Sequence, residues 1–150
     1  MKKILAVFAT LALAVAAHAA PALSGAMAPA PSGNGYSETM TWTQAAACGT
    51  VVNGSTAACT GNVYSCSGTC TVASTSNGCT STTSTWNKIA SSQAAGGPYT
   101  DSSPLGGSVS YCVTNVATGG GWTAQESLPS NVFTQTFPLQ GPTGLAGSHN

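Results

Sequence analysis

Charged side chains are scarce in this sequence. Its 150 residues include three Lys or Arg and three Asp or Glu, together 4% of the chain, against roughly 25% in an average soluble domain. A nucleic-acid-binding surface needs several basic side chains on one face, so the composition argues against nucleic acid as a partner. Hydrophobic residues make up 42% of the chain and its formal net charge is zero, whereas disordered chains combine low hydrophobicity with high net charge. A folded core is therefore expected.

Groups that could carry catalysis are equally scarce. The carboxylates are Glu38, Asp101 and Glu126, in three separate segments, whereas glycoside hydrolysis needs two carboxyl groups held roughly 5 to 10 Å apart. A serine nucleophile needs a partner base, and His149 lies next to the end of the chain. We therefore expect a protein that is not an enzyme and that binds no cofactor or metal.

A long apolar run occurs only at the N-terminus. Lys2 and Lys3 precede an apolar stretch over residues 4–17, and the small-residue motif Ala17-His18-Ala19 follows. This is the order of a bacterial secretory signal peptide, and the stretch is shorter than the roughly 20 residues of a membrane span. We expect cleavage after Ala19, which predicts a secreted or periplasmic protein with no membrane insertion after cleavage.

Apolar residues at helical spacing are also missing, whereas alternation typical of strands recurs. Met40 and Trp42 alternate with threonines, and the same period of two appears over residues 108–114 and 131–137. Shorter apolar segments occupy residues 62–66, 86–90 and 98–101. Short strands separated by turn-forming residues predict an all-β fold, an antiparallel sandwich or barrel. Residues 20–35, rich in Ala, Pro and Gly, are expected to form an extended leader or a loosely held edge, and residues 139–150 a flexible tail.

The six cysteines all follow the predicted cleavage site. They are Cys48, Cys59, Cys66, Cys70, Cys79 and Cys112. Zinc sites favour paired Cys-x-x-Cys motifs or histidine ligands, whereas three residues separate Cys66 from Cys70. An even number of cysteines in an exported chain favours disulfides, so three bridges are preferred to a metal site.

Several segments, in this order, resemble a fibronectin type III domain of the bacterial extracellular kind. They are Trp42 with its flanking threonines, Trp86-Asn-Lys-Ile-Ala90, Pro98-Tyr-Thr-Asp101, Gly106-Gly-Ser-Val-Ser-Tyr-Cys-Val-Thr-Asn-Val116 and Gln125-Glu-Ser-Leu-Pro-Ser-Asn131. The resemblance implies an immunoglobulin-like, antiparallel two-sheet sandwich over residues 36–138. The cysteine-rich loops between residues 44 and 85 are longer than in that family, which leaves the strand boundaries there open.

The resemblance also implies which side chains face inward. Those are Trp42, Val63, Val109, Tyr111, Val113 and Phe133. Cys66 and Cys112 then fall on the outer faces of neighbouring strands, so the resemblance implies a cross-strand bridge Cys66–Cys112, with Cys48–Cys59 and Cys70–Cys79 as staples within loops.

Two amides are expected on the inward side. A register that places Val113 opposite Phe137 makes Asn115 face Gln135. An inward amide is costly unless it finds hydrogen-bond partners, so a mutual hydrogen bond is preferred to a buried ligand site.

Because few side chains could catalyse a reaction or bind a metal, we expect the function to depend on contact surfaces. Trp122 lies in a Gly-rich loop, where it could stack on a sugar or anchor a protein contact, or instead fold over the open end of the core. The sequence predicts a secreted, non-catalytic binding or spacer module that contacts polysaccharide or a cell-surface protein. The alternative is a structural subunit that self-associates into a surface layer or fibre, because the edge strands have few lysines to discourage pairing. The oligomeric state stays open.

Overall fold

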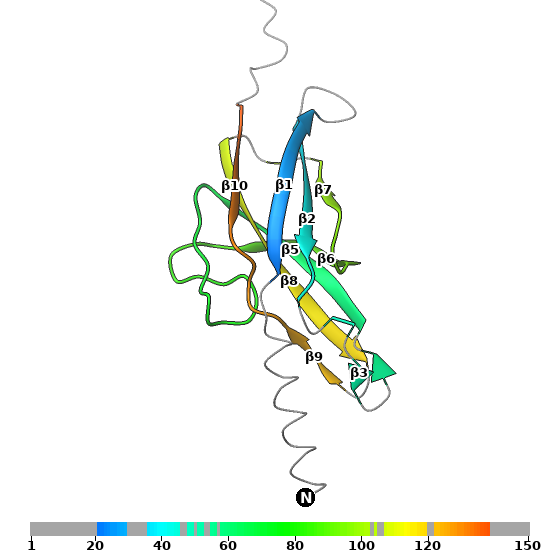
Figure 1. Ribbon diagram of the computed structural model, residues 1–150. Helices are drawn as coiled ribbons and strands as arrows, with labels where there is room; N and C mark the ends of the chain where they lie inside the picture. Colours follow the sequence, from blue (N-terminus) through cyan, green and yellow to red (C-terminus); the bar gives the residue numbers. More distant parts are fainter. Residues whose placement is uncertain are drawn as a thin grey trace, which may run out of the picture.

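Two antiparallel sheets pack face to face in the computed structural model of the protein (Figure 1). The structure describes residues 21–29, 36–45, 48–49, 51–52, 55–56, 58–102, 104, 107–119 and 122–138. Within these ranges every regular element is a strand, which confirms the all-β prediction. The described residues contain no helix with the length and hydrophobicity of a membrane span. The predicted signal peptide (residues 1–19) and tail (residues 139–150) lie outside these ranges.

The smaller sheet has the order β1-β2-β7. Its strands are β1 (Ala22–Pro29), β2 (Tyr36–Thr43) and β7 (Tyr99–Asp101). β1 is an edge strand that pairs with β2 along its whole length. The segment expected to be a leader or a loose edge therefore contributes a strand, and the sandwich begins earlier in the chain than residue 36.

The larger sheet has the order β10-β8-β5-β6, with β9 also paired to β8. Its strands are β5 (Ala58–Ser67), β6 (Asn87–Ala94), β8 (Gly107–Gly119), β9 (Trp122–Glu126) and β10 (Phe133–Phe137). A small hairpin of β3 (Val51–Val52) and β4 (Ser55–Thr56) belongs to neither sheet. β8 lies at the centre, because it pairs with β5, β9 and β10.

The core lies between the two sheets and follows the predicted alternation. On β2, Met40 and Trp42 are buried while Thr41 and Thr43 are exposed. The buried residues of this core are Leu23, Met40, Trp42, Val63, Val109, Tyr111, Val113 and Phe137. Five of the six predicted inward residues are among them, and the sixth, Phe133, is half-buried and packs against the cluster.

The predicted register between the last two long strands is wrong. Phe137 faces Gly107, and Gln135 faces Val109, so Gln135 lies six residues along β8 from Asn115. The Asn115 amide instead accepts a hydrogen bond from the Ala45 backbone N–H (2.8 Å) and donates to the Ala95 carbonyl (3.0 Å). The inward amide is satisfied as expected, but by backbone groups of two loops, which alternation along strands does not locate.

Candidate functional site

The outer face of the larger sheet is covered by the chain between β5 and β6. We call residues 68–86 the cover segment. Ser110, Cys112 and Thr114 point to this outer face of β8, yet each is fully buried. In Figure 1 the cover segment is the green trace that loops out on the left of the larger sheet, away from β2 and β7. The sandwich therefore has a third, irregular layer on one side.

Both polar and apolar contacts attach the cover segment to the sheet. The Ser110 hydroxyl donates to the Gly68 carbonyl (2.7 Å) and accepts from the Cys70 backbone N–H (3.1 Å). Farther along, Val72 and Trp86 pack against a second buried cluster. This second cluster consists of Tyr64, Cys79 and Cys112. The cover segment is thus anchored at both ends by buried groups of the sheet.

All six cysteines are paired, which confirms three disulfides, but two of the predicted pairings are wrong. Cys48–Cys59 is present as expected, while the others are Cys66–Cys70 and Cys79–Cys112, with Cα–Cα distances of 6.3 and 6.2 Å. Cys66 and Cys112 do share the outer face. However, Tyr64 is directly opposite Cys112, so Cys66 is its diagonal neighbour.

Strand geometry explains this correction. Diagonal neighbours in an antiparallel pair are roughly 7 to 8 Å apart, whereas the Cβ atoms of a disulfide need to be about 3.5 to 4.5 Å apart. Cys112 is instead reached from above by Cys79 of the cover segment. The sequence marked Cys112 as outward-facing, but it did not show that a distant loop lies over that strand.

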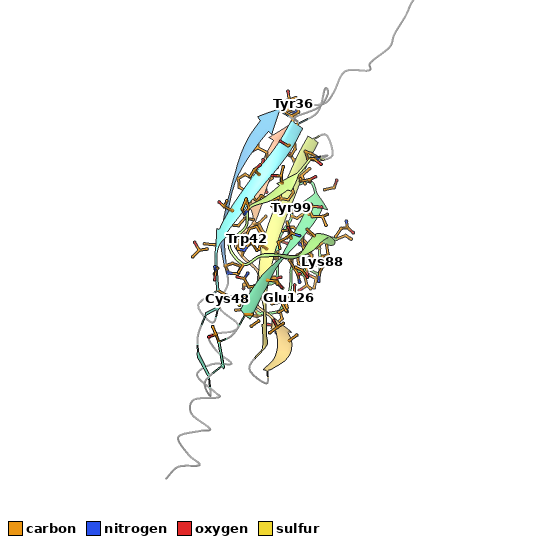
Figure 2. All side chains as sticks on the ribbon, turned by 90° about the vertical axis from the view of Figure 1, so that its right-hand side faces the viewer. Tyr36, Trp42, Cys48, Lys88, Tyr99 and Glu126 are labelled. Carbon is orange, nitrogen blue, oxygen red and sulfur yellow. A yellow bond between two sulfur atoms is a disulfide. The ribbon has the colours of Figure 1, made fainter. Side chains whose placement is uncertain are left out.

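Glu126, at the end of β9, is held on the same outer face. One carboxylate oxygen, Oε1, accepts hydrogen bonds from the Asn62 amide (2.9 Å), the Tyr64 hydroxyl (2.6 Å) and the Thr114 hydroxyl. The ammonium of Lys88 lies 5.2 Å from the centroid of the Tyr64 ring. Figure 2 shows Lys88 and Glu126 on this part of the larger sheet.

These contacts change the pKa values of Glu126 and Tyr64. Burial would raise the pKa of Glu126, but the three hydrogen bonds and the positive charge of Lys88 outweigh it, and the pKa lies below its ordinary value. Burial, followed by the neighbouring Glu126 carboxylate, raises the pKa of Tyr64. Glu126 is therefore an ionised anchor for β9 that accepts hydrogen bonds from its neighbours' hydroxyl and amide groups.

The other two carboxylates are brought together by the smaller sheet. Glu38 on β2 is directly opposite Asp101 on β7, although the two are far apart in sequence. Glu38 is fully buried, and Asp101 accepts a hydrogen bond from the Tyr111 hydroxyl (3.0 Å). Burial, followed by Asp101, raises the pKa of Tyr111. This pair lies at the core, on the opposite side of the larger sheet from Glu126.

A groove opens where the cover segment leaves and rejoins the sheet. It has a volume of about 320 Å³, and we call it the cover-segment groove. Its polar lining is Ser67, Thr69, Thr83, Ser84, Thr85 and Asn87, and the buried Cys66–Cys70 disulfide completes it. No charged side chain is among these lining residues. This groove was missed because the region was interpreted as part of the cysteine-rich loops between residues 44 and 85. Val72, an apolar residue within a polar stretch, was the available sign that the segment packs on the sheet.

The remaining candidate, Trp122, begins β9. Its backbone pairs with Gly119 across the β8–β9 turn, but its side chain lies outside the described residues. His149 lies outside them as well. Within the described part of the chain, no three His, Cys, Asp or Glu side chains gather as metal ligands would.

Comparison with known proteins adds no family to this picture. No protein-family model matches the chain, and no curated protein or solved structure matches it.

Proposed function

We propose that the mature chain is a secreted, non-catalytic binding or spacer module of the fibronectin type III type that contacts a polysaccharide or a cell-surface protein. The observation that carries this proposal is the strand order. Immunoglobulin-like sandwiches place strands A, B and E in one sheet and C, F and G in the other. Here β1, β2 and β7 correspond to the first set, and β5, β8 and β10 to the second.

Export is supported by the cysteines. All six are paired, and disulfides are consistent with an extracellular or otherwise oxidising compartment. With the N-terminal pattern of Lys2, Lys3 and an apolar stretch, this favours a secreted or periplasmic location.

A binding role, rather than catalysis, is supported by how the carboxylates are used. Glu126 accepts three hydrogen bonds from its own sheet, and Asp101 accepts one from Tyr111. Glu38 is fully buried within the sandwich. Glu126 and Asp101 are thus committed to hydrogen bonds within the fold, and Glu38 is enclosed in its interior.

The test is a binding measurement with the secreted protein. The mature chain should co-sediment with a cell-envelope preparation, and either glycosidase or protease treatment of that preparation should remove binding. Trp122→Ala, compared with the unmodified chain, tests the predicted contact residue. Absence of any binding to intact envelope would contradict a binding role.

A structural subunit that self-associates is the second candidate function, and the β10 edge of the larger sheet favours it. β10 (Phe133–Phe137) ends the larger sheet and has no charged residue, and charged residues normally discourage edge-to-edge pairing. Sedimentation analysis at rising protein concentration separates the two: the binding-module proposal expects a persistent monomer, and the alternative expects growing assemblies.

A further inference from the structure

We infer that the cover-segment groove is a binding site for a neutral saccharide. This inference rests on the proposed function and names the ligand class and the site. The groove's volume of about 320 Å³ falls at the lower end of the roughly 300 to 1,000 Å³ typical of small-molecule pockets. It is suited to a few sugar units rather than to a protein surface.

The lining fits a polyhydroxylated, uncharged ligand. Five lining side chains carry hydroxyl groups and Asn87 carries an amide, and all of these can both donate and accept hydrogen bonds. Each hydroxyl of a sugar needs the same two capacities. A phosphate, carboxylate or cation would lose hydration without gaining an opposite charge, which is costly.

The first wall of the groove is held rigid before any ligand arrives. The Cys66–Cys70 disulfide closes the turn that carries Ser67 and Thr69. Within this turn the Ser110 hydroxyl bonds to the Gly68 carbonyl and the Cys70 backbone N–H. Ligand binding therefore requires little further ordering of this wall, and such ordering is one of the main costs of binding.

The second wall is fixed by a cluster of hydroxyl groups. Thr71 bonds to Ser81 and Thr83 through their side chains at 3.2 and 3.1 Å, and its backbone N–H donates to the Ser84 hydroxyl (3.2 Å). Trp86 donates from its indole to the Thr71 carbonyl (2.9 Å). Thr83 and Ser84 are thus tied to Thr71. Asn87 is tied to β5 through its pairing with Ser65.

The experiment is a titration of the isotopically labelled mature protein, followed by backbone amide NMR. The probes are soluble neutral hexasaccharides of glucose, galactose, mannose or N-acetylglucosamine. At least one should shift the amides of Thr69, Thr85 and Asn87. Thr69→Trp, which fills the groove, should weaken that binding at least tenfold. Thr75→Trp places the same bulk at an exposed position of the cover segment outside the groove and should leave binding unchanged.

A second variant keeps the inference testable if Thr69→Trp fails to fold. Thr85→Val keeps the shape of the side chain and removes one hydroxyl, and it should weaken binding about three- to tenfold, as expected for loss of one hydrogen bond. The inference is overturned if no hexasaccharide binds, if the shifts lie elsewhere, or if Thr85→Val binds like the unmodified chain. The envelope sedimentation test judges the proposed function separately: envelope binding that survives glycosidase treatment would keep that function and reject the saccharide site.

Discussion

Trp42 and Asn115 come from different sheets and donate hydrogen bonds to the same backbone carbonyl, that of Ala95. The donors are the Trp42 indole and the Asn115 amide. Asn115 also accepts from the Ala45 backbone N–H just after β2. Figure 2 shows Trp42 beside the strands of the larger sheet. One carbonyl and one amide therefore connect β2, β8 and the turn after β6.

Replacing Asn115 tests this connection. Asn115→Leu leaves the Ala45 N–H without its buried acceptor and should lower the free energy of unfolding by about 2 to 4 kcal/mol. Gln135→Leu is the matched control, because Gln135 lies on half-exposed β10 away from Asn115, and it should cost less than 1 kcal/mol. Urea denaturation of both variants measures the difference. Equal losses would favour the mutual Asn115–Gln135 contact that the sequence suggested.

Gly61 is required beneath the Trp42 ring. A Cβ atom at Gly61 would lie 2.5 Å from Cζ2 of Trp42, so Gly61→Ala should cost about 1 to 3 kcal/mol through overpacking. In a Trp42→Leu background the same substitution should cost much less, because the ring is gone. A double-mutant cycle on unfolding free energies measures this coupling. Additive costs would mean that Gly61 and Trp42 are not in contact.

Glu126 should make stability depend on acidic pH. The pKa of Glu126 in the folded chain is lower than its ordinary value of 4.5. Its ionised carboxylate therefore stabilises the fold fully above pH 4.5, and this stabilisation is lost as the pH falls through the folded pKa. The free energy of unfolding should therefore decline as the pH falls below 4.5. In Glu126→Gln this decline should be shallower, since Gln keeps an acceptor oxygen but has no charge.

The hydrogen bonds of Glu126 have a separate test at neutral pH. Glu126→Ala leaves Asn62, Tyr64 and Thr114 without their shared acceptor and should cost about 2 to 4 kcal/mol at pH 7. Glu126→Gln should cost less. If the pH profile of Glu126→Gln follows that of the unmodified chain, Glu126 does not cause the acid sensitivity.

The three disulfides should differ in their contribution to stability. Their sequence separations are 4, 11 and 33 for Cys66–Cys70, Cys48–Cys59 and Cys79–Cys112. Loop entropy gives losses of about 2, 3 and 3.5 to 4 kcal/mol when each pair is replaced by serines. Thermal unfolding of the three double variants should follow that order, and the greatest loss for Cys66–Cys70 would contradict it.

Much of the fold could be predicted from alternation along the strands. Met40 and Trp42 alternate with threonines, and Val109, Tyr111 and Val113 alternate with small polar residues. Burial on one face of a sheet produces this period of two, so the inward residues follow directly from the sequence. The Cys48–Cys59 pair could also be predicted, because it closes a local loop rich in turn-forming residues.

The candidate site could not be predicted in the same way. The small polar residues Ser110 and Thr114 look solvent-facing, yet both are buried. Ser110 contacts residues 68–70 of the cover segment, and Thr114 contacts Glu126 of β9. That covering depends on the Cys79–Cys112 link and on Trp86, which are contacts between distant residues in an irregular segment. No periodicity encodes such contacts. The β8–β10 register differs from the predicted one by an even number of residues. Such a shift keeps the same side chains facing inward, so alternation does not determine it.

The most direct test is a non-reducing peptide map of the protein purified without reducing agent. Attachment of the cover segment to the larger sheet predicts three cystine-linked peptides, joining Cys79 to Cys112, Cys66 to Cys70 and Cys48 to Cys59. A peptide that joins Cys66 to Cys112, or six free thiols in the native protein, would contradict it.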